Sequence, residues 1–131
     1  MKKLTIGAMG VLLLIAGSLL AHHSWGNFYD LDRQVILKGR VSKVDFKEPH
    51  VLLTIETRRS GTWIAEFTNV EDLKRNGIVE ETFKAGEYLE ILGSPARDPE
   101  KHIVAAIWEI RRSADGFRWS WQEWPGPPVI E

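Results

Sequence analysis

The stretch 34–47 places the strongest constraint on what this 131-residue chain can fold into. Leu37, Gly39 and Val41 fall on one side of an alternating pattern, as expected for a strand with one buried face. The alternation then changes phase, so that Val44 takes the buried position. A phase change beside a glycine within a strand is typical of a bulge or a sharp bend. The sequence therefore predicts one long, bent strand.

Four further segments have strand-like patterns, with turn residues between them. A short helix is expected between the third and fourth strands, because Asn69 can cap its start and Gly77 can end it. This order predicts an all-β fold, a small OB-like five-stranded barrel with one short helix between strands 3 and 4. A plain antiparallel sandwich is the alternative. The expected strands are 34–47, 50–58, 62–68, 87–94 and 102–112, and the expected helix is 70–76.

Residues 1–21 have the pattern of a secretory signal peptide. Lys2 and Lys3 precede an uncharged apolar run, and Ala21 is a small residue suited to cleavage. An uncleaved membrane anchor is the alternative, since the run is close to the length that spans a bilayer. We expect cleavage and export, with membrane contact only through this segment before cleavage. The predicted organisation is signal peptide 1–21, N-terminal arm 22–33, barrel 34–112 and Trp/Pro-rich C-terminal tail 113–131.

The composition narrows the function classes. Lys and Arg number 17 against 18 Asp and Glu, which argues against a nucleic-acid partner. The absence of cysteine excludes disulfides, thiolate metal sites and thiol nucleophiles. No motif of a hydrolase, a nucleotide-binding loop or a metalloprotease is present. Binding is therefore favoured over catalysis.

The histidines are the candidate metal ligands. His22 and His23 would open the mature chain, and His50 follows a proline that could direct its ring. With Met1 and Met9 removed, the mature chain holds no sulfur, so any site uses nitrogen and oxygen. Such donors favour copper(II), with zinc or nickel as alternatives. We expect His22, His23 and His50 to bind copper(II), the α-amino group of His22 assisting.

Less specific interpretations of the same histidines remain. His22 and His23 could be surface residues at a frayed end, and His50 could simply pack at the rim of the barrel. Cleavage after Leu20 would instead leave a histidine at position three, a different copper-binding pattern. The alternative function is a metal-free envelope module that binds a peptide, glycan or protein partner.

Tryptophans in the tail supply the candidate surface for that alternative. Trp119 and Trp121 have strand spacing and could cover an open face of the barrel. They could also form a stacking platform for a ligand or lie at a membrane interface.

Several short segments form a recognisable set. They are Ala-His-His-Ser-Trp at 21–25, Phe-Tyr-Asp at 28–30, 37–44, Glu-Pro-His at 48–50, 73–77, 84–87 and 93–98. In these segments the chain resembles a family of small exported bacterial proteins of unknown function, and the resemblance extends over most of residues 21–112. Trp25 stands where the family usually has phenylalanine, and Glu48 stands where it usually has asparagine. The resemblance implies an exported barrel, in the periplasm or secreted by a bacterium, with recurring histidines and no assigned activity.

Overall fold

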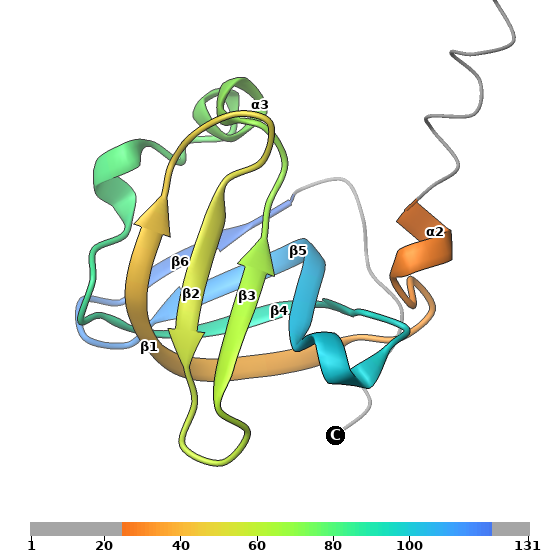
Figure 1. Ribbon diagram of the computed structural model, residues 1–131. Coiled ribbons are helices and arrows are strands. Elements are labelled where there is room, and N and C mark those ends of the chain that lie inside the picture. The colour runs from red at the N-terminus through yellow and green to blue at the C-terminus, as the bar shows by residue number, and fades with distance from the viewer. Residues whose placement is uncertain (1–24, 122–131) are drawn as a thin grey trace, which may run out of the picture.

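The computed structural model describes residues 25–121. Six strands account for most of the regular structure, and the helices are short (Figure 1). In chain order the elements are α2 (Trp25–Phe28), β1 (Val35–Asp45), β2 (Leu52–Glu56), β3 (Thr62–Glu66), α3 (Val70–Arg75), the 3₁₀ turn η2 (Glu80–Thr82), β4 (Tyr88–Pro95), the 3₁₀ turn η3 (Pro99–Lys101), β5 (Ile103–Arg112) and β6 (Phe117–Ser120).

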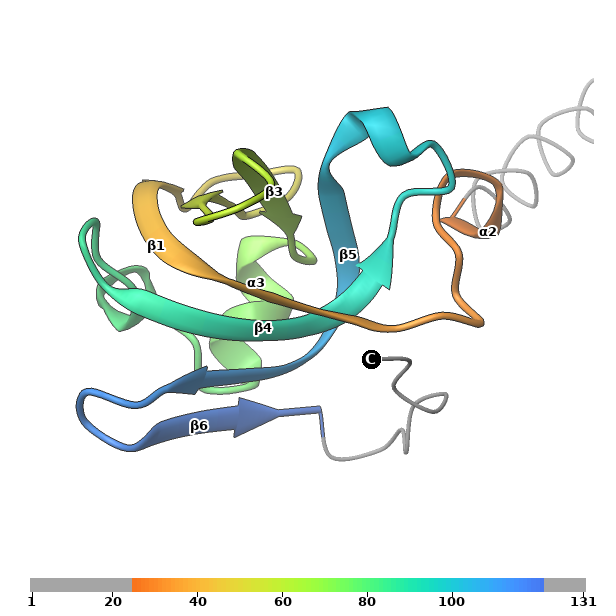
Figure 2. The same ribbon diagram turned by 90° about the horizontal axis from the view of Figure 1, so that it is seen from below.

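The strands form one sheet in the order β3-β2-β1-β4-β5-β6, which closes because β3 also pairs with β5. The β3–β5 pairing is parallel and the others are antiparallel. The first five strands therefore make a closed barrel, and α3 follows the third of them (Figures 1 and 2). The predicted all-β, OB-like five-stranded barrel is confirmed, and its five strands begin and end close to the predicted positions.

The barrel encloses one apolar core, to which every barrel strand contributes. Alternating residues of β1, β2 and β3 point inward, and the buried ones are Leu37, Val41, Leu53, Ile55 and Ala65. Leu73 of α3 joins the same core, and Figure 1 shows this helix at the end of the barrel opposite the β2–β3 hairpin. The largest fully buried side chains are Leu53, Ile55, Leu73, Ile78, Leu89, Ile91 and Ile110.

The bend of β1 occurs where the sequence places it. Residues up to Arg40 pair with β4, residues from Arg40 onward pair with β2, and the β2 register shifts between Val41 and Lys43. Gly39 lies at the crossing, where an added Cβ would be 2.5 Å from the backbone oxygen of Glu56. Only a residue without a side chain fits there, which allows one strand to serve both halves of the barrel.

Helix α3 has both of the expected end signals. The Asn69 side chain accepts a hydrogen bond from the Asp72 backbone N–H at 2.8 Å. At the other end Gly77 has a positive φ of 84°, and the N–H groups of Gly77 and Ile78 donate to Lys74 and Leu73 carbonyls. These bonds satisfy the last carbonyls of the helix and turn the chain back toward the core.

Part of the predicted tail is a strand. β6 pairs with β5 in antiparallel register, with Trp119 opposite Ile110 (Figure 2). The Trp119 ring packs against the core, and its Nε1–H donates to the Asn76 carbonyl at 2.8 Å. Trp119 therefore covers the barrel, one of the interpretations that its strand spacing allows.

The predicted signal peptide, residues 1–21, lies outside the described residues. Among residues 25–121, no helix combines the length and the apolar character required to cross a bilayer.

Replacement of Gly39 tests the close approach of β1 to β2. We expect Gly39→Ala to lower the free energy of unfolding by about 1–3 kcal/mol, because the new methyl group would collide with backbone that cannot easily move. Denaturant unfolding measures the change. Gly26→Ala is the matched control, since no atom lies within 4 Å of a Cβ added there. Equal stability of the two variants would contradict the interpretation.

Replacement of Trp119 tests the attachment of β6. We expect Trp119→Phe to cost about 1 kcal/mol of unfolding free energy beyond the loss caused by the smaller ring, because the hydrogen bond to Asn76 is removed while an aromatic ring is kept. Trp121→Phe is the control, because no hydrogen bond from the Trp121 indole is found within residues 25–121. A loss of the same size in both variants, measured by thermal or denaturant unfolding, would show that the bond contributes nothing.

Candidate functional site

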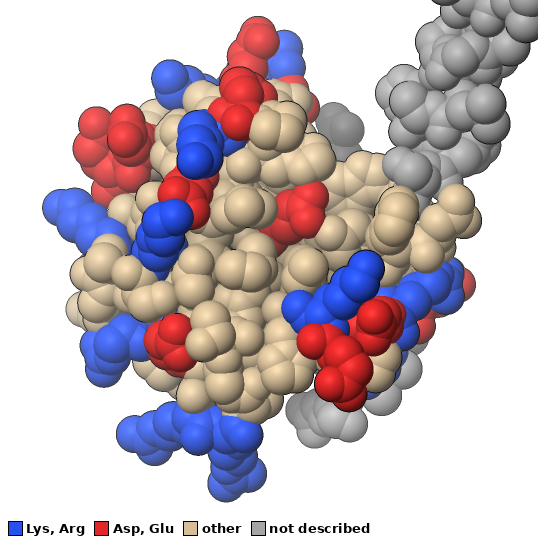
Figure 3. Space-filling model, viewed as in Figure 1, with Lys and Arg blue, Asp and Glu red and all other residues tan. Residues whose placement is uncertain are grey.

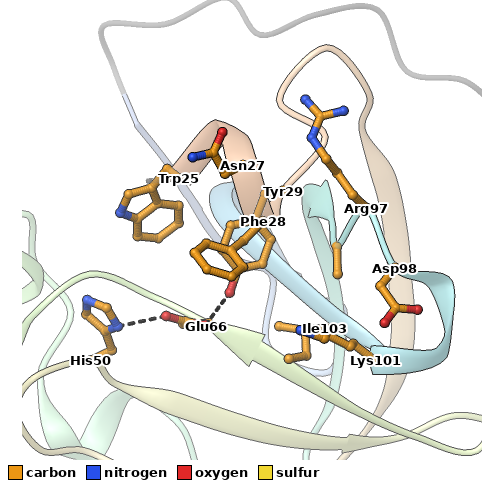
Figure 4. Close-up of a pocket in the computed structure, with 11 residues that line it drawn as sticks. Trp25, Asn27, Phe28, Tyr29, His50, Glu66, Arg97, Asp98, Lys101 and Ile103 are labelled. Atoms are coloured by element: carbon orange, nitrogen blue, oxygen red, sulfur yellow. Dashed lines mark hydrogen bonds and ion pairs between the residues drawn. The ribbon is translucent and has the colours of Figure 1, made fainter. Parts of the chain in front are cut away.

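A pocket of about 310 Å³ opens where α2 lies against the barrel (Figure 4). One wall holds Trp25, Tyr29, His50 and Glu66, and the other is formed by Phe28 and the β4–β5 connection. That connection contributes Arg97, Asp98 and Lys101. The pocket therefore combines residues from four separate parts of the sequence.

Glu66 is the central group of the first wall. Its Oε2 accepts a hydrogen bond from the Tyr29 hydroxyl at 2.5 Å, and its Oε1 lies 2.7 Å from Nδ1 of His50. The Glu66 side chain is largely buried, whereas the His50 side chain is 41% exposed. One carboxylate thus joins a residue of the N-terminal arm to a residue of the β1–β2 loop.

The backbone explains why His50 and Glu66 meet. The N–H of Val51 donates to the Thr68 carbonyl, and the Val51 carbonyl accepts from Phe67. In the adjoining ladder Leu52 lies opposite Glu66. His50 precedes Leu52 by two residues and so falls on the same face, diagonal to Glu66, where such side chains are within reach of one another.

Tyr29 is a fixed donor in this arrangement. Burial raises the pKa of its hydroxyl far above the ordinary value, and the hydrogen bond to Glu66 and the negative charge of that carboxylate raise the pKa further. The phenol therefore keeps its proton at any physiological pH. Since Tyr29 occupies one oxygen of Glu66, the other oxygen is directed to His50.

Among residues 25–121, the His50 imidazole has a polar partner at one of its two ring nitrogens. Nδ1 faces Glu66, and the second ring nitrogen, Nε2, points away from it (Figure 4). A carboxylate on Nδ1 fixes the ring orientation and leaves Nε2 as the basic, ligand-binding nitrogen, the arrangement commonly found behind metal-bound histidines. His50 is therefore suited to supply one nitrogen ligand.

The N-terminal arm is attached to the barrel beside His50. Nε of Arg97 donates to the Gly26 carbonyl at 2.7 Å, the Arg97 N–H donates to Phe28, and the Asp30 N–H donates to Pro95. The Trp25 ring lies 6.0 Å from the His50 ring and 5.2 Å from Tyr29, between centroids. Trp25, the first described residue, therefore lies next to His50, the one predicted metal ligand among residues 25–121.

Of the three predicted metal ligands, the structure describes His50 alone. His22 and His23 lie outside the described residues, and His23 precedes Trp25 by two positions in the sequence. Within residues 25–121, no group of three or more His, Cys, Asp or Glu side chains could hold a metal ion. His102 lies elsewhere, stacked on Trp63 with parallel rings 4.7 Å apart.

The predicted tryptophan platform is a separate feature. Trp119 and Trp121 contact each other edge to face, with ring centroids 5.3 Å apart. Neither lines the pocket around His50. Trp119 packs against the core and donates its indole N–H to the Asn76 carbonyl.

Sequence reasoning did not identify Tyr29 or Glu66 as site residues. Glu66 follows the outward alternation of β3, which is the ordinary place for a solvated carboxylate. Its partnership with His50 depends on strand register, and that with Tyr29 spans 37 positions. Local patterns carry no signal for either contact.

Comparisons with known proteins give the fold and the family. The comparison with curated proteins finds no significant match. Among solved structures, a chain in the crystal structure of the S. pombe Stn1-ten1 complex is similar, with a TM-score of 0.50 and 12% identity. That match covers 61% of this chain and only 57% of the other, and at this identity the likeness shows the fold alone. Residues 11–105, well over half of the chain, match the model of a family described only as being of unknown function, so the protein belongs to the Family of unknown function (DUF6152).

Proposed function

We propose that this protein, exported after removal of residues 1–21, binds a copper(II) ion through His22, His23 and His50. The observation that carries the proposal is the His50 imidazole, whose Nδ1 lies 2.7 Å from the Glu66 carboxylate. Its Nε2 points away from Glu66 (Figure 4). The Glu66 carboxylate is itself held by the Tyr29 hydroxyl, so the orientation of the His50 ring is supported from behind.

The chemistry of the available donors fits this ion. Imidazole nitrogens suit copper(II), zinc and nickel, and the general order of affinities favours copper(II) among them. The chain has no cysteine, and its two methionines, Met1 and Met9, lie in the segment expected to be removed. A soft site for copper(I) therefore has no sulfur ligands from which to form.

The other two ligands come from the segment just before Trp25. The centroid of the Trp25 ring lies 6.0 Å from that of the His50 ring. His22 and His23 precede Trp25 by only three and two positions, which favours their binding the same ion as His50. Cleavage after Ala21 would add the α-amino nitrogen of His22 as a further donor. A site of this kind joins the mature N-terminus to the barrel.

A metal-free binding module for a peptide, glycan or protein is the second candidate. The observation that favours it is the other wall of the same pocket, where the exposed Phe28 ring lies 5.9 Å below the Lys101 ammonium. An apolar ring beside a cation suits a ligand with an apolar body and a negative group. On this alternative, removal of His22 and His23 would leave ligand binding intact.

A copper titration of the mature protein tests the proposal. We expect one site tighter than about 1 µM, visible as a d–d absorption band, because nitrogen donors bind copper(II) strongly. His22→Ala combined with His23→Ala should abolish the site. His50→Ala should weaken it at least about tenfold and shift the band, since one nitrogen is lost. Intact mass of the exported protein must first establish that the chain begins at His22.

His102→Asn is the matched control for that titration. His102 is the other histidine among residues 25–121, and asparagine tolerates its left-handed backbone, with φ of 47°. This variant should bind copper as the unaltered protein does. A site no tighter than micromolar, or a band that survives the loss of both N-terminal histidines, would exclude the proposed ligand set.

Glu66→Gln tests the support given to His50. The amide can keep the bond from Tyr29 but removes the negative charge behind Nδ1, so we expect copper(II) affinity to fall about 10- to 100-fold with little loss of stability. Glu90→Gln is the control, because Glu90 pairs with Lys38 and does not line the pocket. Unchanged affinity of Glu66→Gln would mean that the carboxylate has no part in ligand positioning.

A further inference from the structure

A second hollow lies between the first half of β1 and the β2–β3 hairpin. It has a volume of about 520 Å³, and four consecutive residues, 35–38, form one of its sides. Consecutive side chains of a strand point to opposite faces, so a hollow bordered by all four lies along the edge of the strand. Arg58, Arg59 and Trp63 of the hairpin form the opposite side.

The edge of β1 has unpaired backbone groups at this place. In an antiparallel ladder, every second residue bonds to the same neighbour. The Val41 N–H donates to Glu87 on the β4 side, so the odd-numbered residues of this half of β1 face β4. The backbone N–H and C=O groups of Ile36 and Lys38 therefore point away from β4, to the side on which β2 lies. Pairing between β1 and β2 begins only at Arg40. Within residues 25–121, no strand pairs with this edge at Ile36 and Lys38.

Aliphatic and aromatic side chains surround this open edge of β1. Ile36 is 45% exposed and Tyr88 is 44% exposed. Trp63 is held in place by a hydrogen bond from Nε1 to the Ser60 hydroxyl at 3.0 Å and by its stack on His102. A fixed aromatic ring and an exposed aliphatic side chain beside an open strand edge suit an extended chain with apolar groups.

The charge around the hollow has one sign. Lys38, Arg58 and Arg59 line it, and no carboxylate does. Lys38 pairs with Glu90, whereas no ion pair to Arg58 or Arg59 is found in the part of the chain that the structure describes. Blue side chains gather at the tip of the β2–β3 hairpin in Figure 3, at the bottom of the view. This surface is complementary to a negatively charged ligand.

We propose that this hollow binds an extended acidic segment of another protein, which adds a strand to β1 beside Ile36 and Lys38. Backbone hydrogen bonds to the open edge supply affinity, and the two arginines select negatively charged segments. A peptide is favoured over other polyanions because the hollow offers unpaired backbone donors and acceptors in strand geometry. The site is separate from the His50 pocket and does not depend on copper.

The test uses a short fluorescein-labelled peptide in which Glu alternates with Val. We expect it to bind the mature protein, as followed by fluorescence anisotropy, and to slow the hydrogen exchange of the Ile36 and Lys38 amides. The same peptide with alternate backbone amides N-methylated keeps its charge but cannot pair as a strand, so its affinity should fall at least about tenfold. A Lys/Val version should not bind measurably.

Two protein variants locate the site. Arg58→Glu combined with Arg59→Glu should lower the affinity at least about tenfold, because attraction becomes repulsion at an exposed hairpin whose change does not disturb the core. Lys74→Glu combined with Lys84→Glu reverses the same number of charges at exposed positions that do not line the hollow. This control for net charge should bind within about twofold of the unaltered protein. Copper affinity should be the same in all three proteins.

Four outcomes would overturn the proposal. Equal binding of the N-methylated peptide, or of an oligothymidylate in competition, would make the hollow a general polyanion site. An unchanged affinity in the double arginine variant would place the peptide elsewhere. Peptide binding that appears only after removal of residues 122–131 would mean that the protein's own tail occupies the edge.

Discussion

The whole barrel depends on the absence of a side chain at position 39. Strand β1 has to leave one neighbour and join another within a few residues, and the backbones of β1 and β2 approach so closely there that a Cβ would overlap the Glu56 carbonyl. Because β1 bends at this point, β4 and β2 are held on its two halves, and the remaining strands close around one core. Within residues 25–121, the same bend leaves the first half of β1 with no strand on its second edge, so a requirement of folding also produces the surface that we propose for peptide binding.

The candidate site depends on a different kind of contact. Glu66, Tyr29 and His50 belong to a strand, an arm and a loop, and none is held by its immediate neighbours in sequence. Burial keeps the proton on Tyr29, the phenol occupies one carboxylate oxygen, and the other oxygen orients the imidazole. The orientation of the His50 ring therefore follows from the burial of Tyr29, which is not one of the proposed metal ligands.

Much of the fold could be predicted from the sequence because its determinants are local. The phase change near Val44, the cap at Asn69 and the glycine at position 77 each act over a few residues, and each appears at the expected place. The site was harder to predict. His50 is recognisable by residue type, but Glu66 looks like any outward carboxylate until the register with Leu52 is known. β6 was assigned to a tail for a similar reason, since its attachment through Trp119 reaches back to Asn76.

The seam between β3 and β5 has a consequence for motion. Only two residue pairs form this ladder, Ile64 with Ile103 and Ala65 with Val104, whereas the other barrel pairings are longer. Strands joined by so short a ladder, and so far apart in sequence, gain their pairing late in folding and lose it early in local opening. Both Glu66 and Ile103 adjoin this seam and line the His50 pocket. Local opening of the β3–β5 pairing would therefore change the shape of the His50 pocket while β1 and β4 stay paired.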